Sequence, residues 1–375
     1  MEHKELKNKT KNIFERNQKK TIILFTFFIF VLLDFSVLPI YNFFSNRNNQ
    51  NEVSLEKTYR IPSNIYHHDL LKNANIKNAS WGNRKYQIFT NNFGFKCGLD
   101  NEVISLNSSK NRILFIGDSF TEGIGIEFRN TFVGIISQTL AKNNIEVLNA
   151  AVSSYSPIIY WRKIKYLIEN IDLKFNEVIV FIDVSDIRDE ALYYSLSKEQ
   201  TVESQKTTFY ERLLSFTQNK TLFLHFSLKF IMKELLWLYF PKTDLTKSAI
   251  WPDSSLLSPE YGAKGLTLST FYMNKLNNLL LSKRIKLKIA VYPWPEQILS
   301  NQYDNKHNRF WTNWANQNNI TIYDFTSYFF NYDSLNLEFN KKTISNYFIE
   351  GDVHWNENGH KLIADKFLEF YLKTK

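Results

Sequence analysis

Short apolar runs alternate with longer amphipathic segments over the C-terminal two thirds of the chain. Runs rich in β-branched and aromatic residues predict strands, and the segments after them have helical periodicity. The predicted strands are 112–117, 145–149, 177–183, 285–292 and 320–324, and the predicted helices are about 129–143, 157–170, 266–283, 304–318 and 358–373. Such nearly continuous apolar strands are typical of parallel sheets covered on both faces. The pattern therefore predicts a three-layer α/β/α domain with a five-stranded parallel sheet.

A longer apolar run lies close to the N-terminus. Residues 21–33 carry no charge, and apolar residues resume after Asp34. As a helix, 21–41 would be about 31 Å long, close to the roughly 30 Å hydrocarbon core of a bilayer. A central Asp raises the free energy of membrane insertion by on the order of 3 kcal/mol, but each Leu, Ile or Phe lowers it by roughly 0.3–0.6 kcal/mol. We expect an uncleaved transmembrane signal anchor over 21–44; a cleaved signal peptide is the alternative, although no small-residue cleavage site follows the run.

The distribution of charge predicts how this anchor is oriented. The chain has 46 Lys and Arg against 37 Asp and Glu residues, a net charge of +9. Residues 1–20 hold seven basic and three acidic side chains, which is nearly half of the excess. Because basic flanks stay in the cytoplasm, we expect a single-pass protein with a cytoplasmic tail over 1–20 and the rest of the chain periplasmic or on the cell surface. Membrane orientation thereby explains nearly half of the basic excess, and the net charge gives no support to nucleic-acid binding.

Two further segments complete the predicted organisation. Residues 45–110 form a polar linker and a lead-in without sustained periodicity, and 111–375 form the α/β domain. That domain carries an insertion, 186–265, with an apolar segment over 221–241. His225, Lys229 and Lys233 recur there every four residues, so the segment is a helix packed on the domain with a solvated stripe, or a helix lying on the membrane surface. The lone Cys97 excludes an internal disulfide and a Cys-rich zinc module.

The first candidate for chemistry is the sequence G-D-S-F-T-E-G at 117–123, directly after a predicted strand. Crevices at the carboxyl ends of strands are where such sheets bind ligands. Ser119 would lie there beside exposed backbone N–H groups and a helix N-terminus, which stabilise the oxyanion that forms when a hydroxyl attacks an ester.

A serine nucleophile needs a base, and a candidate precedes the last predicted helix. The sequence D-V-H-W-N-E-N-G-H occupies 352–360. Asp352 and His354 are two residues apart, a spacing that lets the carboxylate reach Nδ1 and directs Nε2 toward Ser119. His360 is interpreted as a surface or capping residue.

These two motifs, with the βα alternation between them, resemble the SGNH/GDSL hydrolase superfamily over about residues 110–373. The resemblance implies a flavodoxin-like sheet with Ser119 as nucleophile, His354 as base and Asp352 as orienting acid. The D-x-H-W form resembles the alginate O-acetylating branch of the superfamily. No cofactor and no metal are expected.

The resemblance also implies two further blocks that supply oxyanion donors, and both depart from the usual pattern. In N-A-A-V-S-S-Y-S-P (149–157), Ser154 stands where the family has Gly. In D-V-S-D (183–186), Ser185 stands where G-x-N-D has Asn. The expected donors are the backbone N–H groups of Ser119 and Ser154 and the Ser185 hydroxyl, provided that Ser154 adopts backbone angles that Gly reaches more easily.

Two other groups of residues attract attention. The aromatic side chains of Y-P-W-P-E-Q at 292–297 would stack on a sugar ring or form a structural turn. His67 and His68 are adjacent, and on an extended segment their side chains would point to opposite faces, which argues against a shared metal.

The sequence thus predicts a membrane-anchored extracytoplasmic serine esterase or O-acyltransferase. Its substrate would be an acyl ester, by analogy an O-acetylated envelope or secreted glycan. One alternative is a lipid ester or thioester hydrolase, based on the apolar residues 221–240. A non-catalytic SGNH-like protein that binds a glycan or a partner is the other alternative, based on the replaced Gly and Asn.

Overall fold

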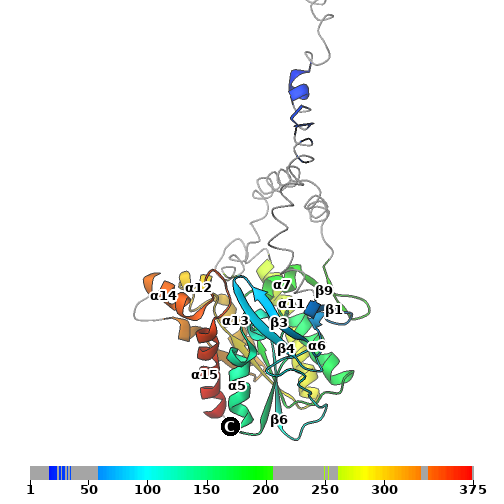
Figure 1. The fold of residues 1–375 in the computed structure, drawn as a ribbon, viewed down its shortest axis with the longest axis vertical. Coiled ribbons are helices and arrows are strands. Elements are labelled where there is room, and N and C mark those ends of the chain that lie inside the picture. The colour runs from blue at the N-terminus through cyan, green and yellow to red at the C-terminus, as the bar shows by residue number, and fades with distance from the viewer. Residues whose placement is uncertain are drawn as a thin grey trace, which may run out of the picture. The chain divides into compact units, whose positions relative to one another are not determined.

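The computed structural model describes residues 58–205, 261–330 and 337–373, with isolated positions between 17 and 34 and at 249 and 252 (Figure 1). Most of the predicted anchor over 21–44 lies outside the described residues, and so does most of the insertion, including 221–241. Among the described residues, no helix combines the length and apolar character that crossing a membrane requires.

The described part of the chain is built on one large mixed sheet. Its strands are β3 (Asn75–Trp81), β4 (Arg84–Thr90), β5 (Lys96–Cys97), β6 (Asn111–Ile116), β7 (Ile145–Asn149), β8 (Glu177–Phe181), β11 (Lys286–Val291) and β12 (Thr321–Asp324). They lie in the order β12-β11-β8-β6-β7-β5-β4-β3. The five strands from β12 to β7 are parallel, with the first of them in sequence, β6, between β8 and β7. This is the doubly wound flavodoxin-like order, and all five predicted parallel strands are confirmed within two residues.

The prediction of a five-stranded sheet is wrong, because the sheet has eight strands. The additional strands β3, β4 and β5 come from the segment interpreted as linker and lead-in, and they pair antiparallel. β5 joins the parallel part through Lys96, which pairs with Asn149 of β7. These strands cover an edge of β7 that would otherwise expose unpaired backbone groups. The lead-in is therefore part of the α/β domain.

Helices cover both faces of the sheet. They are α5 (Phe132–Ala141), α6 (Pro157–Glu169), α7 (Asp186–Leu192), α11 (Ala263–Ser282), α12 (Pro295–Leu299), α13 (Lys306–Gln317), α14 (Leu337–Tyr347) and α15 (Glu357–Lys373). α5 and α15 pack against each other (Figure 1), and α11 packs against α6 and α7. Since all five residues of β8 are buried and successive side chains point to opposite faces, both faces are covered. The five predicted helices correspond to α5, α6, α11, α13 and α15.

A small hairpin is fixed to the domain by a buried ion pair. It consists of β1 (Arg60–Ser63) and β2 (His67–Leu70), which pair antiparallel. Lys163 of α6 is fully buried, and its Nζ lies 2.7 Å from Asp69 Oδ1 in β2. The Tyr66 hydroxyl donates to the other oxygen of Asp69 at 2.7 Å. The carboxylate therefore joins the hairpin to α6.

We expect Lys163→Met to lower the free energy of unfolding by about 3–5 kcal/mol, because it leaves the buried Asp69 carboxylate without its cation. The control is Lys165→Met on the same helix, since Lys165 pairs with Glu169 in solvent and such pairs contribute less than about 1 kcal/mol. Urea unfolding of both variants measures the difference. Equal effects would show that the buried pair does not anchor the hairpin.

Candidate active site

Ser119 lies at the carboxyl edge of the central strand β6. It is the first residue of the short helix α4 (Ser119–Glu122), whose N-terminus is capped by Asp118 accepting from the Phe120 N–H. The turn before it requires glycine, because a Cβ on Gly117 would lie 2.3 Å from Thr121 Oγ1. The G-D-S sequence thus forms a tight strand-to-helix turn that exposes the serine at the strand end.

His354 and Asp352 reach Ser119 from the loop between α14 and α15. His354 Nε2 lies 2.8 Å from Ser119 Oγ, and His354 Nδ1 lies 2.5 Å from Asp352 Oδ1. Asp352 Oδ1 also accepts the backbone N–H of His354 at 2.9 Å, which fixes the carboxylate against the loop. The structure therefore brings together three side chains from motifs that lie 235 residues apart, in the order serine, imidazole, carboxylate.

A fourth residue at this group was not predicted from the sequence. Trp81, at the end of β3, donates its indole N–H to Asp352 Oδ2 at 2.7 Å, and its ring lies edge-on to His354 at 5.3 Å. A two-residue turn, Gly82-Asn83, joins β3 to β4. Gly-Asn between two strand-like runs is a hairpin signal. This sequence signal could have indicated the β3–β4 hairpin. It could not have indicated the contact between Trp81 and Asp352, because that contact depends on the folding of β3 and β4 beside the loop before α15.

The Ser154 backbone adopts angles that glycine reaches more easily, which is the condition for its expected role as a donor. Its φ angle is +64°, in the left-handed region that favours glycine. Tyr155 N–H donates to Val152 O at 3.2 Å, so Val152–Tyr155 form a β-turn. Among the described residues, no hydrogen bond uses the N–H of Ser154 or that of Ser119. Both groups can therefore donate to a ligand.

The Ser185 hydroxyl, by contrast, is already engaged. It donates to Asp183 Oδ1 at 2.7 Å, and the Ser185 backbone N–H donates to the same oxygen at 2.7 Å. Asp183 stands where the G-x-N-D pattern has Gly. Because this carboxylate accepts the hydrogen bond of the hydroxyl, the structure does not present Ser185 Oγ as a free donor.

Three buried carboxylates lie behind the serine. Ligand oxygens of Asp118, Asp183 and Asp186 come within 4.8 Å of one another, the one such group in the described residues that could hold a metal ion. Donors surround them: the Tyr292 hydroxyl near Asp118, the Trp294 indole on Asp183 and the Tyr160 hydroxyl on Asp186. Burial, followed by the charge of Asp183, raises the pKa of Asp118 and Asp186 well above its usual range. The raised pKa favours the protonated forms of these two acids and so limits the negative charge of the cluster.

Two interpretations of other residues change with the structure. Tyr292 and Trp294 are buried, at 0% and 3% exposure, so they support the site as a structural turn and do not offer a face to a sugar.

The expectation that the His67 and His68 side chains point to opposite faces is wrong, because His67 has a φ of +77°. Their Nδ1 atoms lie 2.7 Å apart. His360 is buried, and its Nδ1 accepts the Phe132 N–H at 3.2 Å, which makes it a capping residue of α5.

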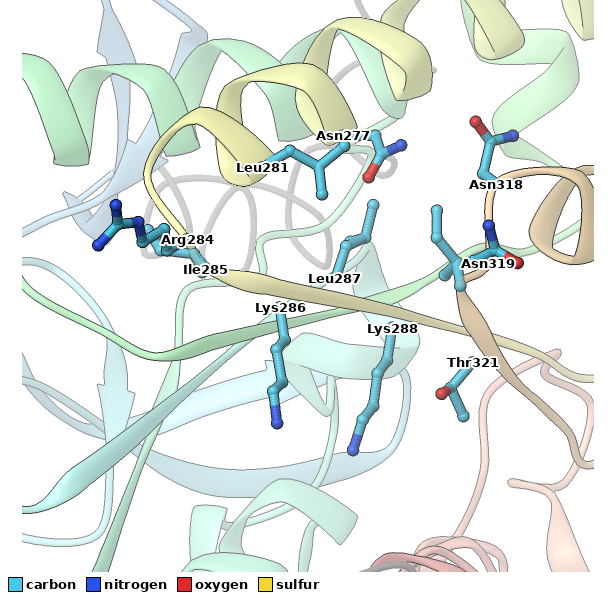
Figure 2. A pocket seen from close by; sticks show the side chains of 11 residues that line it. Asn277, Leu281, Arg284, Ile285, Lys286, Leu287, Lys288, Asn318, Asn319 and Thr321 are labelled. Atoms are coloured by element: carbon cyan, nitrogen blue, oxygen red, sulfur yellow. The ribbon is translucent and has the colours of Figure 1, made fainter.

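A pocket lies elsewhere, at the amino ends of β11 and β12 (Figure 2). Arg284, Lys286 and Lys288 line it together with Asn318 and Asn319. Parallel strands place their amino and carboxyl ends at opposite edges, so this pocket lies away from Ser119. None of the predicted site residues lines it.

The hydrogen bonds of Asp352 predict a pH dependence of stability. Burial raises its pKa, but bonds with His354 and Trp81 outweigh this effect and hold the pKa below its ordinary value of 3.8. A depressed carboxyl pKa stabilises the fold above pH 3.8, and the benefit is lost as the pH falls through the folded-state pKa. Thermal unfolding of Asp352→Asn should show wild type more stable at pH 6, with the difference shrinking below about pH 4. A difference that stays constant with pH would contradict this account.

Comparisons with known proteins found similarity among solved structures. No family model matches the sequence, and no curated protein matches it. The chain is similar to a putative lipolytic protein of the G-D-S-L family from Desulfitobacterium hafniense (15% identity, 69% of this chain and 99% of that chain, TM-score 0.38). It is also similar to a psychrotrophic esterase from Pseudoalteromonas sp. (12%, 70% and 98%, 0.35) and to a catalytic mutant of an acetylxylan esterase from Geobacillus stearothermophilus (16%, 71% and 95%, 0.34). The solved structures similar to this chain thus include a protein of the G-D-S-L family, which the motif at 117–123 resembles.

Proposed function

We propose that the protein is an SGNH-type serine esterase or O-acyltransferase that acts on acyl esters. The observation that carries this proposal is the hydrogen-bonded series from Ser119 Oγ through His354 to Asp352, with distances of 2.8 and 2.5 Å. A serine hydroxyl is a weak nucleophile unless a base takes its proton, and here an oriented imidazole is in contact with it.

The geometry supports a two-step acyl transfer. Ser119 Oγ attacks the carbonyl carbon of the ester, and its proton passes to His354 Nε2. The carbonyl oxygen becomes an oxyanion that the N–H groups of Ser119 and Ser154 stabilise. When the tetrahedral intermediate collapses, His354 returns the proton to the leaving alcohol, and the acyl group stays on Ser119. Water or a second alcohol, deprotonated by His354, then attacks the acyl-serine and frees the serine.

Asp352 and the buried acids adjust the charge around this reaction. Asp352 accepts from Nδ1, so it fixes the tautomer that leaves Nε2 free to receive a proton and stabilises the imidazolium that forms. The raised pKa of Asp118 and Asp186 disfavours the accumulation of negative charge beside a developing oxyanion. Asp183 accepts hydrogen bonds from the Ser185 hydroxyl and from the Trp294 indole.

The cellular setting is also a proposal. The apolar run with its basic flank supports a single-pass anchor over 21–44, with the α/β domain outside the cytoplasm. An extracytoplasmic esterase or acyltransferase encounters O-acylated envelope or secreted glycans, so we propose an acylated carbohydrate as the substrate.

Ser119→Ala should lower the kcat/KM for p-nitrophenyl acetate by at least about 10³-fold, because no other group forms the acyl-enzyme. The matched variant is Ser185→Ala. It should lower the same kcat/KM by less than about 10-fold, because the Ser185 hydroxyl donates to Asp183 and not to the oxyanion. Steady-state hydrolysis by the full-length protein in detergent measures both.

Labelling by a fluorophosphonate probe provides the control for these variants, since only an activated serine reacts. Wild type should be labelled and Ser119→Ala should not. A wild-type protein that is neither labelled nor active would favour the non-catalytic alternative. Preference for long acyl chains over acetate would favour lipid ester cleavage.

The anchor predicts a defined topology in the cell. Protease added to intact spheroplasts should digest the C-terminal domain, while a tag placed before residue 20 should stay protected. A C-terminal domain that resists protease in intact spheroplasts but not after lysis would contradict the proposed orientation.

A further inference from the structure

The turn that presents the Ser154 N–H is conformationally demanding. Among its two central residues, only Ser154 has a positive φ angle, as in a type II turn, where the third position is usually glycine. A non-glycine residue there costs roughly 1–2 kcal/mol. Type I and type II turns differ by a flip of their central peptide. In this turn the central peptide joins the carbonyl of Ser153 to the N–H of Ser154, so a flip would aim that N–H elsewhere.

His68 holds this central peptide. Its Nε2 lies 2.8 Å from the Ser153 carbonyl oxygen. Since a carbonyl only accepts, Nε2 carries a proton and donates it. The bond fixes the carbonyl end of the same planar peptide whose N–H end belongs to Ser154. Donation to the carbonyl also polarises the peptide and strengthens its N–H as a donor.

The tautomer of His68 is fixed by its neighbours. With Nε2 protonated, the Nδ1 of a neutral His68 must accept, and His67 Nδ1 lies 2.7 Å away as the donor. His67 Nε2 then accepts from the Ser204 hydroxyl at 2.7 Å. Burial lowers the pKa of His68 to about 4, so the ring is neutral at pH 7. The positive φ of His67 is what brings the two rings into contact.

Two more side chains hold the flanking peptides. Glu122 Oε2 accepts the Ser153 N–H at 2.7 Å, and Arg60 binds both oxygens of Glu122 at 2.8 Å. Although burial raises it, the charge of Arg60 holds the pKa of Glu122 below its usual range, so Glu122 is a carboxylate. The Tyr194 hydroxyl donates to the Ser154 carbonyl at 2.6 Å. The polar groups around the central peptide are occupied, while the Ser154 N–H is left for a ligand.

We propose that His68 is a positioning residue of the active site, which holds the 153–154 peptide so that the Ser154 N–H faces the oxyanion. This inference rests on the proposed esterase function. It gives the β1–β2 hairpin a role in catalysis through the backbone of Ser154, without any contact between His68 and the substrate.

His68→Phe keeps the ring but removes the donor, and it should lower kcat for p-nitrophenyl acetate by about 10–100-fold with KM changed less than about 3-fold. His68→Gln should retain activity within about 3-fold of wild type, because the Gln amide N–H replaces Nε2–H. Asn64→Ala is the matched control: Asn64 is exposed in the turn of the same hairpin, away from the histidine pair, and the variant should also stay within about 3-fold of wild type.

The decisive variant combines His68→Phe with Ser154→Gly. Glycine reaches a positive φ without the Cβ penalty, so the double variant should have a kcat at least about 5-fold higher than that of His68→Phe, after correction for the effect of Ser154→Gly alone. A merely structural role for His68 predicts no such rescue, because glycine does not repair the hairpin. Full activity of His68→Phe, equal loss in His68→Phe and His68→Gln, or absence of rescue would each overturn the inference. A wild-type protein without activity or labelling would instead overturn the proposed esterase function.

Discussion

The hydrogen bond between His354 and Ser119 joins the turn after the first parallel strand, β6, to the loop before the last helix, α15. The arrangement of the site depends on this bond. Ser119 follows the central strand β6, and His354 precedes the last helix, α15. The flavodoxin-like order places β6 inside the sheet, and α15 packs on α5, the helix that follows β6 after α4. The loop before α15 therefore returns to the carboxyl end of β6. The helix packing that closes the domain also sets the 2.8 Å contact between imidazole and hydroxyl.

The segment before β6 is a working part of this site. The β3–β4 hairpin supplies Trp81, whose indole holds one oxygen of Asp352 while His354 holds the other. The β1–β2 hairpin supplies His68, which holds the peptide of Ser154. The β1–β2 hairpin is attached to the rest of the domain by side chains such as Lys163 on Asp69, and the β3–β4 hairpin by strand pairing through β5. Residues 58–97 thus orient groups from later parts of the chain, namely the Asp352 carboxylate and the peptide between Ser153 and Ser154.

Where the sequence departs from the pattern that it resembles, local contacts compensate. Ser154 stands at a positive φ where that pattern has glycine, and side-chain hydrogen bonds to both neighbouring peptides, from His68 and Tyr194, offset the cost of that conformation. Asp183 stands beside two other buried acids where the G-x-N-D pattern has glycine, and the raised pKa of Asp118 and Asp186 limits the negative charge there. The Ser185 hydroxyl donates to Asp183, so the donors left for the proposed oxyanion site are backbone N–H groups.

The sequence by itself determined the parallel strands, their helices and the grouping of Ser119, His354 and Asp352. Apolar runs of strand length and helical periodicity are local properties, and the two end motifs place their side chains at known ends of these elements. Only the tertiary structure decided that β3, β4 and β5 extend the sheet, because their alternating polar residues carry a weak signal until an edge strand is available to pair with them. Only the tertiary structure brought Trp81 and His68 to the site and turned the Ser185 hydroxyl toward Asp183. These contacts join residues far apart in sequence, or depend on backbone angles such as that of His67, which sequence spacing does not encode.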